Sequence, residues 1–294
     1  MGCVEKSRLE VDTQFVAKER TVGSEHWALV QDECARRFEQ HGFAVERHAY
    51  GAGVNVIGVK PGVESPDEQV ILSAHYDHIA NCSGADDNAI AVAGLFESAR
   101  ALAPVEFSRT LVVACWDEEE LGLIGSRAYA ERARSRSERI VMSYVFEGIG
   151  HRSSQPNSQT IPTGMDLVFP TQVAQVEANQ NRADFVLLVW DDLATTQGEN
   201  FVAMAANVDL PTISAMLTAT QKKSAIFADL RRSDHAAFWD VDFPAMYIGD
   251  TGPFRSTRYH CQGGPDEPGD LDYDFAMRIV MTTTGAVAAE LGLR

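Results

Sequence analysis

Acidic and imidazole side chains recur along this chain directly after apolar runs, where they could act together as ligands or as proton-transfer groups. The runs at 70–74, 110–116 and 139–146 are followed by His75 and Asp77, by Glu119 and Glu120, and by Glu147. The carboxyl ends of the strands in an open parallel sheet form a crevice where ligands bind. If the three runs are strands, we expect their carboxylates and imidazole to gather at one edge of the sheet.

Further groups of the same chemistry lie elsewhere in the sequence, in the segments 84–88 (GADDN), 233–235 (SDH) and 259–260 (YH). Several carboxylates in one cleft raise each other's pKa and destabilise the fold unless a positive charge lies among them. Imidazoles mixed with carboxylates, without thiolates, suit Zn²⁺ or a similar divalent ion. The pattern therefore predicts a metal site.

Alternating apolar runs and helical patterns surround these residues. We predict strands at 43–48, 54–60, 70–74, 110–116, 139–146, 185–190 and 243–248, and helices at 25–40, 88–102, 118–134 and 271–293. Continuous apolar strands that alternate with helices are typical of a mostly parallel sheet covered on both faces. We therefore expect an α/β fold, a three-layer α/β/α sandwich with a mostly parallel, mixed and twisted sheet. Residues 1–294 are interpreted as one domain, with an N-terminal helical segment at 1–42 and a loop or lid at 151–184.

Composition narrows the function classes. The 294 residues carry a formal net charge of −17, which would repel nucleic acid and anionic lipid, so neither is expected as a partner. The longest apolar runs have about eight residues, far below the roughly 18 that a membrane span needs. Five scattered cysteines without a C-x-x-C pair indicate no disulfide framework and favour a reducing compartment. The N-terminus has no apolar signal segment, so we expect a cytoplasmic protein, or an exported one if a leader has been removed.

Five motifs in this order carry a family resemblance that spans residues 70–272. They are His75-Tyr76-Asp77, Gly84-Ala85-Asp86-Asp87-Asn88, Glu119 to Ser126 (EELGLIGS), Ser233-Asp234-His235 and Tyr259-His260. Together they resemble the co-catalytic di-zinc aminopeptidases of the bacterial leucyl aminopeptidase type, whose superfamily also holds glutamate carboxypeptidases and glutaminyl cyclases. The resemblance implies the phosphorylase/hydrolase-like architecture of zinc exopeptidases.

The resemblance also implies a ligand set for two Zn²⁺ ions. Asp87 would bridge them, Glu120 and His260 would complete one site, and His75 with Glu147 the other. The family usually has Asp at the position of Glu147, which reaches one methylene further.

The same resemblance assigns roles around the two ions. Glu119 would be the general base, and the phenol of Tyr259 is a candidate donor to the oxyanion. Asp77 would orient the ring of His75, and Asp234 that of His260. Arg232 is a weaker candidate for anchoring substrate.

Other residues near these motifs receive no ligand role. His78 and His235 lie close by, where they could support a ligand or contact substrate. Cys82 and Cys261 flank metal motifs but have no spacing of their own, so we interpret them as spectators.

The predicted function is therefore a metal-dependent exopeptidase, an aminopeptidase that hydrolyses the first peptide bond of small peptides with a zinc-activated water. Two alternatives stay within the superfamily: a carboxypeptidase or amidohydrolase, and a glutaminyl-cyclase-like transferase. A non-catalytic binding protein of the same fold is a third, and the five retained metal-binding side chains argue against it.

Overall fold

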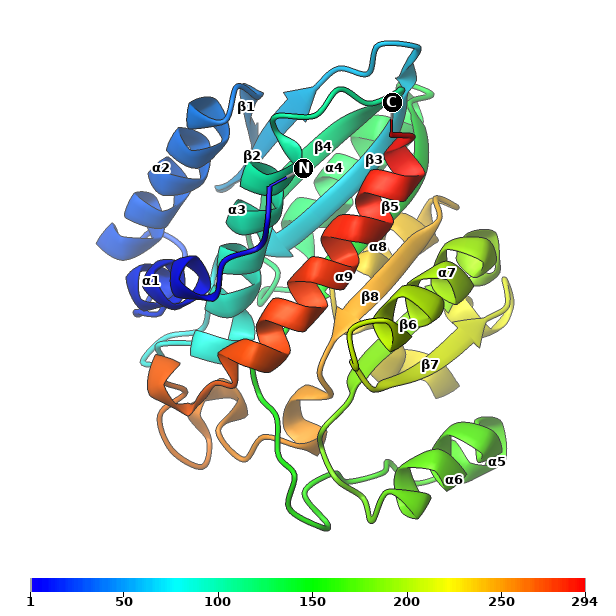
Figure 1. Ribbon diagram of the computed structural model, residues 1–294. Coiled ribbons are helices and arrows are strands. Elements are labelled where there is room, and N and C mark those ends of the chain that lie inside the picture. The colour runs from blue at the N-terminus through cyan, green and yellow to red at the C-terminus, as the bar shows by residue number, and fades with distance from the viewer. Residues whose placement is uncertain (1, 294) are drawn as a thin grey trace.

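The computed structural model describes residues 2–293, in which one mixed sheet runs through the molecule with helices on both faces (Figure 1). Its strands are β1 (Ala44–Tyr50), β2 (Gly53–Lys60), β3 (Ser65–His75), β4 (Arg109–Trp116), β5 (Arg139–Glu147), β6 (Val186–Asp191), β7 (Thr212–Leu217) and β8 (Ala245–Gly249). They lie in the order β1-β2-β4-β3-β5-β8-β6-β7. The central pairs β4/β3, β3/β5 and β5/β8 are parallel, as is β6/β7, whereas β1/β2, β2/β4 and β6/β8 are antiparallel. The predicted α/β fold with a mixed, mostly parallel sheet is confirmed.

The helices are α1 (Lys6–Val16), α2 (Glu25–Gln40), α3 (Ile90–Leu102), α4 (Ile124–Ser135), α5 (Met165–Val168), α6 (Pro170–Ala178), α7 (Thr195–Ala206), α8 (His235–Asp240) and α9 (Tyr273–Leu291). One face of the sheet is covered by α1, α2, α3, α7 and α9, and the other by α4 and α8 (Figure 1). These are the three layers of the predicted sandwich.

The apolar runs of the central strands are continuous because these strands are buried on both faces of the sheet. Along β3, Val70, Leu72 and Ala74 pack in the cluster under α3 and α9, while Ile71 packs in the cluster under α4 and α8. Successive side chains of a strand point to opposite faces, so a strand buried on both sides needs apolar residues at every position. This burial stabilises the parallel pairing of β3 with β4 and β5, which brings the ends of the three strands together.

Local signals set the bounds of two helices. The hydroxyl of Ser24 accepts a hydrogen bond from the amide of Trp27 (3.2 Å), so α2 starts where its cap predicts. The carboxylate of Asp272 accepts one from the amide of Phe275 (2.9 Å) and starts α9 in the same way. The prediction of a helix over 118–134 is partly wrong, because α4 begins only at Ile124.

The segment 151–184, predicted as a loop or lid, contains the short helices α5 and α6. In Figure 1 these two helices lie beyond one end of the sheet, apart from the layers that cover its faces. Among residues 2–293, no helix combines the length and the apolarity that crossing a membrane requires.

Candidate metal centre

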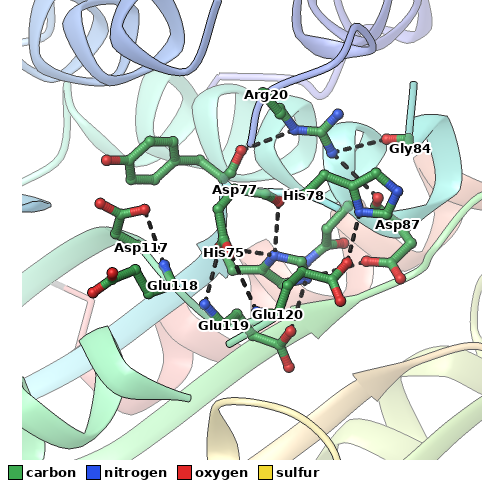
Figure 2. Close-up of polar contacts among 12 residues, drawn as sticks. Arg20, His75, Asp77, His78, Gly84, Asp87, Asp117, Glu118, Glu119 and Glu120 are labelled. Atoms are coloured by element: carbon green, nitrogen blue, oxygen red, sulfur yellow. Dashed lines mark hydrogen bonds and ion pairs between the residues drawn. The ribbon is translucent and has the colours of Figure 1, made fainter. Parts of the chain in front are cut away.

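Three neighbouring parallel strands end at the candidate site. His75 is the last residue of β3 and Glu147 the last of β5, while the turn 117–123 follows β4 and carries Glu119 and Glu120. Because β3 lies between β4 and β5, these side chains meet at one sheet edge, as the sequence predicts. Figure 2 shows His75, Glu119 and Glu120 at this edge.

Asp87 lies between two imidazoles. Its Oδ1 is 3.3 Å from Nε2 of His75, and its Oδ2 is 3.2 Å from Nε2 of His260. Glu147 Oε2 is 3.4 Å from the same nitrogen of His75, and Glu120 Oε2 is 3.1 Å from that of His260. The five predicted ligands thus form two groups that share the carboxylate of Asp87.

The donor atoms fit divalent cations. Two groups of residues each bring their ligand atoms within 4.8 Å of one another. One group is His75, Glu119 and Glu147, and the other is His78, Asp87 and Glu120. Three buried atoms here, Oδ1 of Asp87, Oε1 of Glu120 and Nε2 of His260, make no hydrogen bond to any described residue. Buried polar atoms are normally satisfied, so these positions suit coordination to Zn²⁺.

His78 is a member of this cluster that the sequence interpretation did not assign. It is buried, its Nδ1 lies 2.6 Å from Oε1 of Glu120, and its ring meets that of His260 edge-on at a centroid separation of 5.8 Å. The only sequence signal is its position directly after Asp77 in the run His75-Tyr76-Asp77-His78. The strand ends at His75, so the alternation of side chains along a strand does not predict the direction of the His78 side chain.

The turn that carries Glu119 and Glu120 is held by Asp77. The two carboxylate oxygens of Asp77 accept hydrogen bonds from the amides of Glu119 (3.0 Å) and Glu120 (3.2 Å), and Oδ1 lies 3.5 Å from Nδ1 of His75. Glu118 and Leu123 adopt left-handed backbone conformations (φ 53° and 61°), which a helix cannot include. This explains why α4 starts late and why the two acids stand on a turn.

Charges in the cleft shift the proton affinities of the ligands. Burial opposes protonation of His75, but the carboxylates of Glu147 and Glu119 outweigh it and raise its pKa well above the usual value. Burial likewise opposes protonation of His260, but the neighbouring carboxylates of Asp87 and Glu120 raise its pKa to about 10. The cleft therefore attracts positive charge, which either protons or a divalent cation can supply.

Burial raises the pKa of Glu119 well above its ordinary value, while the ring of His75 opposes the shift. The pKa of Glu147 is also raised by burial, against the ring of His75 and the hydroxyl of Ser233, which donates to its Oε2 (2.7 Å). Ser233 therefore orients the longer acid that stands where the family usually has Asp.

Asp234 differs from the expectation that it orients His260. It is fully buried, and neither of its carboxylate oxygens has a hydrogen-bond partner among the described residues; burial raises its pKa to about 7 against the charge of His75. It precedes α8, which packs against β5 and β8 on the α4 side of the sheet, so it approaches the His75 end of the site.

Tyr259 and Arg232, the last two residues predicted for the site, lie together at a pocket beside the predicted metal ligands. The ring of Tyr259 stacks on that of His260 at a centroid separation of 3.9 Å. Nη2 of Arg232 lies 3.5 Å from the Tyr259 hydroxyl, and the Arg232 side chain is 49% exposed. Both residues line this pocket together with Glu119 and Glu147.

A disulfide joins Cys82 to Cys261, so the expectation that the cysteines form no disulfide is wrong for this pair, although neither residue belongs to the candidate ligand groups. The two residues are 179 positions apart, and no short-range spacing can reveal such a pair. Cys261 follows His260, and Cys82 precedes the turn 84–89 that carries Asp87. The bond thus ties together the two segments that face each other across one half of the cluster.

Comparison with known proteins agrees with the geometry. The model of "Peptidase family M28" matches residues 55–283. The uncharacterized protein YfbL of Escherichia coli is 28% identical over 225 residues, covering 72% of this chain and 64% of that protein. Aminopeptidase YwaD of Bacillus subtilis is 36% identical over 150 residues, covering 49% of this chain and 31% of that protein. The chain thus spans less than two thirds of the length of these relatives.

Solved structures share the fold. The LapA aminopeptidase of Legionella pneumophila superimposes with a TM-score of 0.70 at 14% identity, over 99% of this chain and 73% of that chain. Glutaminyl cyclase of Porphyromonas gingivalis superimposes with a TM-score of 0.68 at 14% identity, over 98% of this chain and 99% of that chain. At such identities the likeness concerns the fold alone.

Proposed function

The chain belongs to peptidase family M28, and on that premise we propose that it is a zinc-dependent exopeptidase that removes the amino-terminal residue of small peptides. One observation carries the proposal: the two carboxylate oxygens of Asp87 face two different imidazoles, each of which has a further acid beside it. This is the arrangement that two adjacent cations need if they share one carboxylate.

His75, Asp87 and Glu147 would hold one ion, and Asp87, Glu120 and His260 the other. Bound zinc polarises a carbonyl group and lowers the pKa of a coordinated water. Glu119 would act as general base, because its carboxylate is buried at the same edge, 3.9 Å from Nε2 of His75, on a turn whose amides Asp77 fixes. The phenol of Tyr259 would donate to the developing oxyanion from the pocket side.

The substrate side chain would enter an apolar pocket next to these acids. Its volume is about 180 Å³, and Glu119, Glu147 and Tyr259 lie along it. The apolar walls come from the segment 151–184 and from β6 and β7: Ile161, Pro162, Met165, Phe169, Val173, Val176, Leu187, Val189, Ile213 and Ala215. Such walls favour a bulky apolar residue at the scissile bond, because charged side chains would lose their hydration there.

The free amine of the substrate would be recognised by the carboxylates of Glu119 and Glu147. A second candidate function, a carboxypeptidase or amidohydrolase, is supported by Arg232. This half-exposed cation lines the same pocket and has Asp229 3.8 Å away, so it could bind a substrate carboxylate instead.

Zinc stoichiometry combined with a hydrolysis screen tests the proposal. The expected result is two zinc ions per chain by emission spectroscopy, and cleavage of free Leu and Phe dipeptides that N-acetylation abolishes and C-amidation spares. Loss of cleavage on C-amidation alone would favour the carboxypeptidase. Cyclisation of glutaminyl peptides without hydrolysis would favour the transferase, and failure to bind zinc would overturn the proposal.

A further inference from the structure

Arg20 is a fully buried cation of the N-terminal segment whose donors are all used on main-chain carbonyl oxygens. Its Nε donates to Tyr76 (2.9 Å), its Nη1 to Lys18 (3.2 Å) and Ser83, and its Nη2 to Gly84 (2.9 Å) and Asp87 (3.2 Å). A guanidinium group has five N–H donors in a planar fork, and here five carbonyls accept from them. Figure 2 shows the contacts of Arg20 with Gly84 and Asp87.

Four of the five acceptors belong to two segments of the metal cluster, and the fifth, Lys18, belongs to the N-terminal segment itself. Tyr76 lies between the ligand His75 and Asp77, while Gly84 and Asp87 belong to the turn that carries the shared carboxylate. The backbone of this turn is irregular, with φ −106° and ψ 92° at Asp87. Buried carbonyls outside regular structure need other donors, and Arg20 supplies them.

The main-chain N–H groups of the same turn donate hydrogen bonds to a carboxylate. The carboxylate of Asp266 accepts hydrogen bonds from the amides of Asp86 (3.0 Å) and Asp87 (3.3 Å). The peptide groups around Asp87 are therefore fixed from both sides, with carbonyls on a cation and amides on a carboxylate. This fixes the backbone position from which the Asp87 carboxylate reaches His75 and His260.

The charge of Arg20 also acts on the cluster. Burial disfavours a cation strongly unless nearby negative charge compensates it. The carboxylates of Asp87, Asp77 and Glu120 act on Arg20 through space rather than through contact, since its donors are occupied. In return, the fixed positive charge offsets part of the repulsion among those acids.

We propose that Arg20 is a positioning residue of the metal centre, which fixes the main chain of Asp87 against that of Tyr76 so that the shared carboxylate faces both imidazoles. The inference rests on the proposed zinc site and adds to it. Arg20 lies outside residues 55–283, the part of the chain that the family model matches. The N-terminal segment would therefore contribute to the geometry of the metal centre.

Arg20→Lys tests this, because lysine keeps the charge but has three donors on one atom and cannot span the five carbonyls. We expect zinc affinity, measured by competition with a chromogenic chelator, to fall about tenfold or more, as when residues that orient metal ligands are replaced. The visible absorption spectrum of the Co²⁺-substituted protein should also change. Arg109→Lys is the matched control, since Arg109 pairs with Glu68 (2.6 Å) and Glu290 (3.1 Å) at the opposite end of β4.

Unchanged affinity and an unchanged Co²⁺ spectrum in Arg20→Lys would overturn the inference while leaving the zinc site intact. Failure of the unmodified protein to bind zinc would instead overturn the proposed function.

If Arg20→Lys fails to fold, hydrogen exchange of the unmodified protein tests the role of Arg20 instead. Zinc should slow amide exchange in residues 17–24 as well as in 82–88 if Arg20 couples them, whereas α2 serves as the internal control. Protection of 82–88 without any change in 17–24 would overturn the inference.

Discussion

Nδ1 of His78 lies 2.6 Å from Oε1 of Glu120, while the other carboxylate oxygen of Glu120 lies 3.1 Å from Nε2 of His260. One acid therefore stands between two imidazoles, just as Asp87 does. In the proposed zinc site, His78 would be either a further ligand of the ion bound by Glu120 or a fixed support for that acid. In both cases it belongs to the half of the cluster that Asp87, Glu120 and His260 form.

Replacement of His78 should weaken one zinc site selectively. In His78→Asn we expect about 10–100-fold weaker binding of one of the two zinc ions, the range found when groups that support metal ligands are removed. Isothermal titration of the metal-depleted protein measures both sites. His41→Asn is the control, because His41 ends α2 far from the cluster, and equal affinities in the two variants would contradict the prediction.

Glu119→Gln should separate catalysis from metal binding. Glutamine keeps the size of the side chain but cannot accept a proton, so kcat should fall about 10²–10⁴-fold while two zinc ions stay bound. The control is Glu118→Gln on the same turn, whose carboxylate points away from His75 in Figure 2. A rate for Glu119→Gln close to that of the control would refute its role as the base.

Reduction of the disulfide between Cys82 and Cys261 should destabilise the protein and loosen the zinc held by His260. Removing a native disulfide typically costs about 2–5 kcal/mol, and this one closes a loop of 179 residues. Urea unfolding and zinc affinity of Cys82→Ser/Cys261→Ser measure the two effects, with Cys3→Ser as control, since Cys3 is exposed and unpaired.

The oxidised chain should show three titratable thiols in denaturant, from Cys3, Cys34 and Cys115. Because such bonds persist in oxidising compartments, we propose that the protein works in one, which favours the exported protein over the cytoplasmic one among the two expectations from sequence. Five titratable thiols in protein isolated without reductant would contradict both statements.

His235 should make the folded protein less stable in acid. Burial lowers its pKa to about 4, so the folded chain keeps the ring neutral while the unfolded chain takes up a proton below pH 6.5. Stability is therefore lost as pH falls from about 6.5 to 4, by about 3 kcal/mol in total. Nε2 of the ring donates a hydrogen bond to the main-chain carbonyl oxygen of Leu230 (2.9 Å), and the ring lies edge-on to that of Trp239.

Urea unfolding of chelator-treated protein at pH 7, 5.5 and 4.5 measures this effect. His235→Gln does not titrate in this range, so its stability should fall less steeply with acid than that of the unmodified chain. Parallel slopes in the two proteins would show that His235 does not contribute.

Much of the fold follows from local patterns. The apolar runs of β3, β4 and β5 are continuous because both faces of the sheet are covered, and Ser24 and Asp272 start α2 and α9 through short-range caps. The order of these elements is enough to bring His75, Glu119, Glu120 and Glu147 to one edge, since parallel neighbours end on the same side.

Long-range contacts decided the rest. The turn that carries Glu119 depends on amides bonded to Asp77, 42 residues away in the chain, and Arg20 holds Asp87 across 67 residues. The bond between Cys82 and Cys261 and the approach of His78 to Glu120 are of the same kind. Spacing and periodicity in a sequence describe only residues that are close together in the chain. They therefore do not predict which main-chain groups a buried cation contacts, or the path of a turn that contains left-handed residues. Both depend on the packing of the whole chain.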